Sequence, residues 1–351
     1  MKQRMDHTAS QPSAAEAAPP AFDTPVPAAA STILAADVGG TFARVALAEI
    51  PRRGEPRILA LRRYACAEHP SLASILRDFR QAEGRAVNGA TVAIAGVLDG
   101  DRLVNTNLPW PVSLQATRRE AGLAWLELMN DFEAVAHAIA HVPAQALVPL
   151  NGEQPRSLQW PALVLGPGTG LGAALRLPDG EHPVLASEAG HSALAPANAL
   201  ELEILGKLMR RWPHVDTERV LSGTGLMNLY PCLCEIRGAT PRWNTPSELV
   251  EAALHGGDAL AAETLDVFCG WLGSVCGDLA IVFGARSVYL AGGITAHIEP
   301  FLLQGSFRER FLAKGVLGEV LAHVPVWRVE HGELGVLGAA AWHAWRRGTG
   351  A

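Results

Sequence analysis

The sequence predicts an α/β fold made of two related halves, and three observations support this prediction. Apolar segments of strand length alternate with longer segments of helical period. Each half opens with two strands around a glycine-rich turn, and polar residues follow the ends of several strands. Alternating strands and helices are typical of an α/β sheet. The repeated opening indicates an internal duplication of one α/β unit, with a ligand bound in the cleft between the halves.

The first half begins at Thr32 and reads as three strands, a helix and two further strands. The strands are predicted at residues 32–36, 45–48, 58–64, 91–95 and 125–129. The helix follows Ser71, which can cap its N-terminus, and its apolar side chains recur at the spacing i, i+3, i+4 and i+7. These side chains are Leu72, Ile75, Leu76 and Phe79.

The second half repeats this scheme with strands and longer helices. Its strands are predicted at residues 163–165, 173–177, 184–186, 287–290 and 324–329, and its helices at residues 201–211, 260–283 and 335–345. Residues 1–30 precede both halves and are rich in alanine and proline, with no amphipathic period. We interpret residues 1–30 as a disordered tail.

The composition narrows the class of protein. Of the 351 residues, 49% are hydrophobic, which is enough for a substantial core. The formal net charge is −6 and there is no long basic run, so a nucleic acid is not an expected partner. We find no signal peptide and no apolar run of membrane-spanning length without charges or turn residues, so we expect a soluble protein. The five cysteines are an odd number and fit reduced thiols in a cytoplasm.

The first glycine turn is formed by residues 37–41, Asp-Val-Gly-Gly-Thr. Gly39 and Gly40 allow positive φ at both turn positions and leave backbone N–H groups, including that of Thr41, uncovered for a phosphate. Asp37 could hold a Mg²⁺ ion that bridges the same phosphates, directly or through water. Taken alone, the turn is better explained as a plain Gly-Gly hairpin. A second glycine turn and an Asn-Asp pair downstream favour the phosphate interpretation.

The second glycine turn contains Gly168, Thr169 and Gly170, between the strands at residues 163–165 and 173–177. Its letters satisfy the dinucleotide fingerprint G-x-G-x-x-A. That fingerprint requires a helix after the glycines, whereas this segment is short, apolar and soon interrupted by Pro-Asp-Gly. A hairpin that cradles a phosphate is the better interpretation. The chain has neither the Walker lysine motif nor the His-Arg-Asp set of protein kinases.

Asn130 and Asp131 lie where a predicted strand ends and a helix begins. On local evidence the better interpretation is a helix N-cap, which both residue types favour. A functional role is attractive because loops after strand carboxyl ends line ligand clefts in open α/β sheets. A carboxylate there can accept a proton from a substrate hydroxyl.

Glu188 and His191 are three residues apart, a spacing that could bind a metal ion on a helix. Gly190 between them and the apolar strand before them indicate a loop instead. Two polar side chains that reach a polyhydroxylated ligand are the more fitting interpretation. A structural histidine is the alternative.

Taken together, the motifs resemble those of the bacterial glucokinases, in the hexokinase and actin-like ATPase superfamily. The resemblance runs from about Ile33 nearly to the C-terminus. It rests on residues 37–44, Thr106 and Asn107 with Trp110, and residues 128–132, 166–172, 188–191, 218–223 and 290–294. It implies a two-domain actin-like ATPase (ribonuclease H-like) fold with duplicated βββαβα units and an interdomain cleft. Residues 31–141, completed by a C-terminal helix within residues 331–351, would form the small domain, and residues 142–330 the large one.

The resemblance also implies an activity, the transfer of the γ-phosphate of ATP to the 6-hydroxyl of D-glucose, as the entry to glycolysis. Asp131 would be the general base. The sugar hydroxyls would be held by Asn107, Asn130, Asp131, Glu188, His191 and Glu218. The phosphates would lie against Gly39, Gly40, Thr41, Gly168, Thr169 and Gly170, the nucleoside against Gly292 and Gly293, and Mg²⁺ at Asp37. A homodimer is possible, and closure of the domains over glucose should exclude water.

The chain departs from the family pattern at three places. Phe42 stands where the family usually has asparagine, which would remove a polar contact near the nucleotide. Ala189 replaces a usual glycine, and Val97 replaces a usual proline. The chain lacks the C-x-C-G-x-x-G-C motif of the related repressor and kinase group, so we expect no structural zinc. Two alternatives to a glucokinase are a sugar-binding regulatory protein with weak or lost kinase activity, and an actin-like ATPase that acts on a protein partner.

Overall fold

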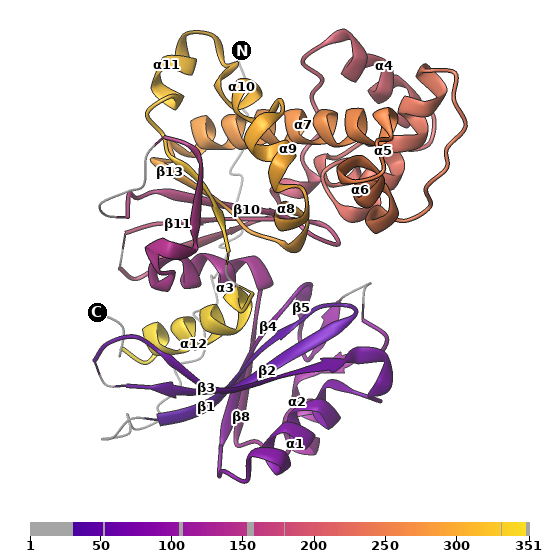
Figure 1. Ribbon diagram of the computed structural model, residues 1–351. Helices are drawn as coiled ribbons and strands as arrows, with labels where there is room; N and C mark the ends of the chain where they lie inside the picture. The colour runs from indigo at the N-terminus through magenta and orange to yellow at the C-terminus, as the bar shows by residue number, and fades with distance from the viewer. Residues whose placement is uncertain are drawn as a thin grey trace, which may run out of the picture.

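The computed structural model describes residues 31–51, 53–104, 108–152, 158–178, 180–330 and 332–348. These residues form two lobes, one below the other in Figure 1, each built on its own β-sheet. Helices α3 (Asp131–Ala138) and α12 (Leu334–Arg346) lie between the two sheets. Residues 1–30, interpreted from the sequence as a tail, lie outside the described residues.

The first sheet has the strand order β3-β2-β1-β4-β8. Its strands are β1 (Ser31–Val38), β2 (Phe42–Ile50), β3 (Arg57–Ala65), β4 (Gly89–Ile94) and β8 (Trp125–Met129). β1 pairs antiparallel with β2 and parallel with β4, which in turn pairs parallel with β8. All five predicted strands of this half are present, and the first three extend beyond the predicted residues.

The second sheet has the order β12-β11-β10-β13-β14-β9. Its strands are β9 (Leu147–Asn151), β10 (Ala162–Pro167), β11 (Leu171–Arg176), β12 (Val184–Ser187), β13 (Ser287–Leu290) and β14 (Val326–Val329). The first three strands after β9 form antiparallel pairs, and β13 and β14 then continue the sheet in parallel, as β4 and β8 do in the first sheet. The matching order confirms the predicted duplication, and β9 is an antiparallel addition at the edge.

One face of the first sheet is covered by α1 (Leu72–Glu83). The Oγ of Ser71 accepts a hydrogen bond from the N–H of Ser74, which confirms the predicted cap, and the helix ends at Gly84 with φ of 62°. The four predicted apolar side chains of α1 are buried in the same core cluster as β1, β2 and β4. This lobe also contains α2 (Leu114–Glu120) and a small sheet of β5 (Val97–Asp99), β6 (Arg102–Val104) and β7 (Val112–Ser113), which are too short to leave a periodic pattern in the sequence.

The opposite face of the first sheet is covered by α12, the last helix of the chain. Val336, Ala339 and Ala340 of α12 pack in one buried cluster with Ile33 of β1 and Ala46 of β2. Small side chains allow a close approach, as Gly338 shows: a Cβ there would lie 1.7 Å from the carbonyl oxygen of Ala134 in α3. The C-terminal helix therefore supplies part of the core of the lobe that the N-terminal strands form.

The second lobe is largely helical above its sheet (Figure 1). Its helices are α4 (Ala199–Leu208), α5 (Gly223–Ile236), α6 (Pro246–Leu254), α7 (Ala259–Phe283), α8 (Gly293–His297), α9 (Glu299–Gln304), α10 (Phe307–Leu312) and α11 (Gly318–Leu321). The sequence predicted α4 and α7 only. α7 is long and apolar enough to cross a membrane by length and composition alone, but it contains Glu263, Asp266 and Asp278, and its side chains Phe268, Trp271 and Leu272 are fully buried in the core. The five cysteines are free and buried, as expected for reduced thiols.

Candidate active site

A cavity of about 480 Å³ lies between the two lobes, within the usual size range of ligand pockets. Its walls come from both sheets and from α3, α8 and α12. Among the lining residues are Asp37, Arg44, Asp131, Gly292, Gly293, Arg328 and Gly335. The cavity therefore brings together residues that the sequence placed in separate motifs.

The first glycine turn connects β1 to β2 at one side of this cavity. The N–H of Gly39 donates to the carbonyl of Phe42 at 3.0 Å, which closes a two-residue turn over Gly40 and Thr41. Neither glycine adopts a positive φ, so the predicted conformational use of the glycines is wrong here. The N–H groups of Gly40 and Thr41 donate to no residue that the structure describes. The turn therefore offers two N–H groups to an anion.

A buried cysteine supports this turn from below. The N–H of Cys66 donates to the carbonyl of Thr41 at 2.9 Å, and its thiol donates to the carbonyl of Gly39 at 3.4 Å. Trp110 donates its indole N–H to the carbonyl of Cys66 at 3.3 Å. Burial raises the pKa of the Cys66 thiol, so the thiol remains a neutral donor. Cys66 had no predicted role beyond a reduced thiol.

Asp37 lies at the end of β1, directly opposite Arg44 on β2. The guanidinium of Arg44 is 3.5 Å from the carboxylate. Burial raises the pKa of Asp37, and the positive charge of Arg44 opposes this rise. The first turn of α12 packs closely against this carboxylate, because a Cβ on Gly335 would lie 2.5 Å from the Cγ of Asp37. Arg44 and Gly335 were not predicted as site residues.

Phe42, the departure from the family pattern, begins β2 beside this turn. The guanidinium of Arg63 on β3 lies over its ring, 4.0 Å from the ring centroid. Phe42 and Arg44 are two residues apart on the same strand and so point to the same face of the sheet. The ring therefore occupies the cleft side of the sheet next to a residue that lines the cavity.

The sequence left open whether Asn130 and Asp131 cap a helix or serve a ligand, and the structure assigns the cap to Asn130. The side-chain oxygen of Asn130 accepts hydrogen bonds from the N–H groups of Phe132 at 2.9 Å and Glu133 at 3.0 Å, so Asn130 is the N-cap of α3. Asp131 is the first residue of the helix and accepts one bond from Phe132 N–H at 3.0 Å. Burial raises the pKa of Asp131 to about 6. The hydrogen bond from Phe132 lowers this pKa, and the negative charges of Asp37 and Glu188 raise it. A carboxylate with a pKa in this range can accept a proton near neutral pH.

The second glycine turn connects β10 to β11, and because a strand follows it, the dinucleotide fingerprint is excluded. The N–H of Gly168 donates to Gly170 at 2.7 Å, and the carbonyl of Gly168 accepts from Gly223, the first residue of α5, at 2.9 Å. Glu218 also holds the turn: its carboxylate accepts from Leu171 N–H at 2.8 Å. The N–H of Thr169 has no acceptor among the described residues.

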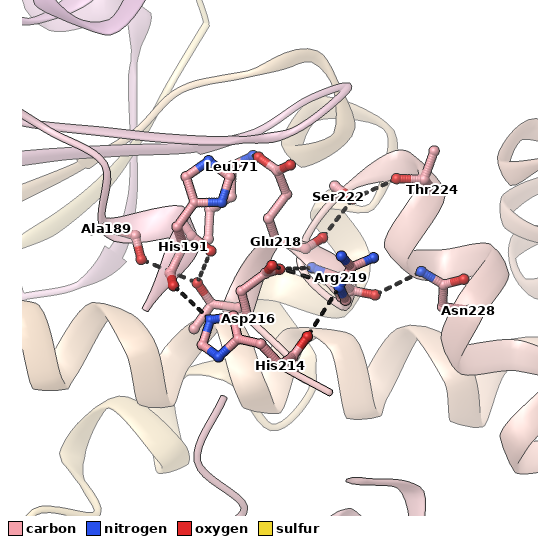
Figure 2. A network of polar contacts seen from close by, with 12 residues as sticks. Leu171, Ala189, His191, His214, Asp216, Glu218, Arg219, Ser222, Thr224 and Asn228 are labelled. Atoms are coloured by element: carbon pink, nitrogen blue, oxygen red, sulfur yellow. Dashed lines mark hydrogen bonds and ion pairs between the residues drawn. The ribbon is translucent and has the colours of Figure 1, made fainter. Parts of the chain in front are cut away.

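Figure 2 shows the network around Glu218 and His191, whose side chains both extend toward Leu171. Two short 3₁₀ turns carry them, η4 (Ala189–His191) and η5 (Thr217–Arg219). Thr217 ties the turns together, because its hydroxyl donates to the carbonyl of Gly190 at 2.7 Å. The ring of His214 contacts the carbonyl of His191 at 3.0 Å, and Ser222 donates to the carbonyl of Glu218 at 2.7 Å. The backbone of both site residues is therefore fixed.

The exposed side chains of Glu188 and His191 bond no described residue and remain available to a ligand. The charge of Glu188 reaches Asp131, since it contributes to the raised pKa of that carboxyl. In the described ranges, no three His, Cys, Asp or Glu side chains are grouped closely enough to hold a metal ion. Asn107 lies outside the described residues.

The Gly292-Gly293 pair follows β13 and lines the cavity. Gly292 has φ of 95°, and a Cβ there would lie 2.5 Å from the carbonyl oxygen of Pro167. A side chain is therefore excluded at Gly292 by both conformation and space. The pair lies in the cavity wall, and the contact with a nucleoside that the sequence suggested stays a prediction.

A buried arginine in the cavity wall was missed. Arg328 of β14 is 1% exposed and forms ion pairs with Glu299 and Glu330. A charged residue inside the apolar segment of residues 324–329 was the available signal, because a buried arginine requires charged partners.

Comparisons with known proteins place this site in context. A family model described as "Glucokinase" matches residues 34–345. A "Glucokinase-like protein" of Xylella fastidiosa is 43% identical over 323 residues, with 91% of this chain and 96% of that protein covered. A "Glucokinase" of Chromobacterium violaceum is 40% identical, with 88% of each chain covered. The crystal structure of a glucokinase from an Antarctic psychrotroph superposes with a TM-score of 0.76 at 32% identity, over 89% of this chain and 98% of that one.

Proposed function

Because the chain belongs to the glucokinase family of ATP-dependent hexose kinases, with their two-lobed actin-like ATPase fold, we propose that Asp131 is the general base of its reaction. The reaction transfers the γ-phosphate of ATP to the 6-hydroxyl of D-glucose. This activity is favoured over the two alternatives that the sequence left open, a regulatory sugar-binding protein and an ATPase directed at a protein partner.

The observation that carries this proposal is the position and pKa of Asp131. Its carboxyl lines the interlobe cavity, and its pKa of about 6 leaves it ionised at neutral pH yet basic enough to accept a proton. The 6-hydroxyl oxygen forms a bond to the γ-phosphorus while the bond from that phosphorus to the β,γ-bridging oxygen breaks. The hydroxyl proton passes to Asp131, and ADP leaves with the bridging oxygen.

The sugar would be held by Asn107, Asn130, Glu188, His191 and Glu218. Support comes from Glu188 and His191, whose exposed side chains bond no described residue, and from the ties that fix the backbone of η4 and η5. Carboxylate, amide and imidazole groups accept or donate in fixed directions, which suits the recognition of a polyhydroxylated ligand. The side-chain oxygen of Asn130 already caps α3, so its NH₂ group would contact the sugar.

The phosphates of ATP would lie between the two glycine turns. The N–H groups of Gly40, Thr41 and Thr169 supply donors that no described residue occupies. Mg²⁺ would be held by Asp37 together with phosphate oxygens and water, which suits its preference for oxygen ligands and the absence of a closed protein cage among the described residues. The ion would neutralise phosphate charge when bound. Gly292 and Gly293 would let the nucleoside lie against the backbone.

We propose further that residues 31–141 with residues 331–351 close as one body over residues 142–330. Closure would exclude water, which could otherwise replace the sugar hydroxyl as acceptor. We also propose a cytoplasmic enzyme that feeds glycolysis and associates with neither nucleic acid nor membrane, with homodimer formation open to measurement by light scattering.

The experiment that tests the function is the formation of glucose 6-phosphate by the purified protein with ATP and Mg²⁺, beside calorimetric titration of glucose alone. Product at ordinary kinase rates is expected, about 1–100 s⁻¹. Glucose binding without product would support a sugar sensor. The absence of both product formation and glucose binding would overturn the proposed function.

A further inference from the structure

Two glycines of the β10–β11 hairpin leave a slot in the second sheet. Gly166 and Gly172 are direct partners across the two strands. Neither has a positive φ, so their use is spatial. The ring of Phe132, from α3, lies in the slot: a Cβ on Gly172 would lie 1.8 Å from its Cδ2, and a Cβ on Gly166 would lie 2.7 Å from its Cζ and 2.6 Å from the carbonyl oxygen of Ala291. The ring therefore takes the place of a side chain at Gly172 and shares the space at Gly166 with the backbone of Ala291.

The residue that fills this slot also holds the base. Phe132 donates its N–H to the carboxylate of Asp131 at 3.0 Å and to the capping oxygen of Asn130 at 2.9 Å. On α12 of the first lobe, Gly338 lies against the carbonyl of Ala134, two residues further along α3. The start of α3 is thus fixed between a sheet of one lobe and a helix of the other.

The same hairpin carries the second glycine turn. Gly166 lies two residues before Gly168, and Gly172 lies two residues after Gly170. The aromatic contact is therefore made at the base of the loop that is proposed to hold phosphate. Phe132 therefore connects the Asp131 carboxylate, which its N–H contacts, to this loop, whose base its ring contacts.

We propose that Phe132 is a positioning residue for phosphoryl transfer, and that its ring in the Gly166–Gly172 slot sets the distance between the Asp131 carboxylate and the 168–170 turn. This inference rests on the proposed function of Asp131 and the turn. Phosphoryl transfer depends mainly on alignment, and a misplacement of about 1 Å can lower a rate by roughly 100-fold. The packing of the ring in the slot would thus align the sugar, at Asp131, with the phosphate of ATP, at the 168–170 turn.

The test uses three variants of the full chain: Gly172→Ala, Phe132→Leu and the double variant. A methyl group at Gly172 must displace the ring, so kcat is expected to fall roughly 10- to 100-fold. Calorimetric Kd values for glucose and ADP should stay within about threefold of wild type, because neither ligand needs the alignment. Leucine leaves room for the methyl group, so adding Gly172→Ala to Phe132→Leu should lower kcat much less than adding it to wild type.

A pH profile separates positioning from loss of folding. Displacement of Phe132 weakens its hydrogen bond to Asp131, so the acid limb of kcat/KM should move to higher pH in Gly172→Ala. Gly206→Ala is the matched control, because a Cβ at Gly206 in α4 meets no atom within 4 Å. It should retain wild-type kcat and pH profile.

The inference is overturned if folded Gly172→Ala keeps wild-type kcat, or if the effects of Gly172→Ala and Phe132→Leu simply multiply. If Gly172→Ala does not fold, Phe132→Leu decides alone, since it must lower kcat without changing glucose Kd. A wild-type protein without kinase activity would instead refute the proposed function, and the positioning role with it.

Discussion

The carboxylate of Glu218 accepts a hydrogen bond from the N–H of Leu171 at 2.8 Å. This bond links Glu218, a predicted sugar-binding residue, to the hairpin that is proposed to hold phosphate. Only one of its two oxygens makes this bond. A Cβ on Gly170 would lie 2.3 Å from the same oxygen, so the carboxylate rests directly on the turn. If Glu218 binds glucose as proposed, we expect occupancy of the sugar site and the shape of the phosphate turn to be coupled through this side chain.

We expect Glu218→Gln and Glu218→Ala to differ in their effect on ATP. Both should weaken glucose binding about 10- to 100-fold, as expected for loss of a charged hydrogen bond of about 1.5–3 kcal/mol. Glutamine can still accept from Leu171, so its KM for ATP should stay near wild type, whereas alanine should raise it several-fold. Steady-state kinetics with each substrate varied measure this difference, and equal KM values for ATP in the two variants would contradict the coupling.

Asp131→Ala should lower kcat by roughly 10²- to 10⁴-fold, the usual contribution of a general base. Glucose affinity should change little, because the cap of α3 is made by Asn130 and not by the base. Single-turnover kinetics and glucose titration report the two quantities separately. Wild-type activity in this variant would remove Asp131 from its proposed role.

The pH dependence of kcat/KM should show one acidic limb. Only the ionised carboxylate can accept the proton, and the pKa of Asp131 is raised to about 6, so the rate should rise with pH up to about 6 and then level. Glu188→Gln removes a negative charge that contributes to the rise. Its limb should therefore lie at lower pH than that of wild type, as a pH series in both proteins can measure.

Asp131 should lower stability where it is ionised. Its folded pKa of about 6 lies above the ordinary aspartate value of 3.8, so the folded state binds its proton more tightly than the unfolded state between these values. Stability is then lost as pH rises from about 4 to about 6. Asp131→Asn avoids this loss and should unfold at a higher temperature than wild type at pH 7, but not at pH 3.5. Calorimetric Tm values at both pH values check the sign.

Phe42→Asn should lower the KM for ATP several-fold if a polar contact near the nucleotide is worth about 1 kcal/mol. The change also removes the ring beneath Arg63, at an expected cost of about 0.5–1 kcal/mol in stability. Glucose affinity should be unaffected, because Phe42 belongs to the first glycine turn region and the sugar residues come from other elements. An unchanged KM for ATP would make Phe42 a neutral substitution.

The fold was predictable because its signals are local. Alternating apolar strands, the Ser71 cap and the repeated glycine turns each appear within a few residues of sequence, whereas the strand order that the two sheets share came from the structure. The site was predictable only as a set of motifs. Local sequence could not separate Asn130 as the cap from Asp131 as the carboxylate that lines the cavity, because both residue types favour the same position.

The missed features depend on contacts between distant segments. The Cys66 support of the first turn joins residues far apart in sequence, and Arg328 needs Glu299 and Glu330 to be stable where it lies. The glycines show the same limit. Gly39 and Gly40 suggested positive φ, whereas Gly166, Gly172 and Gly335 are required by neighbouring atoms that no local pattern identifies.

The position of α12 has a consequence for protein synthesis. The face of β1 and β2 that α12 covers is made in the first part of the chain, but its covering helix is made only after the whole second lobe. Until α12 is synthesised, the nascent first lobe must keep Ile33, Ala46 and their neighbours without these native partners, a state that invites aggregation or chaperone binding. The synthesis of α12, and not the emergence of the first strands, is therefore the step that permits this lobe to mature.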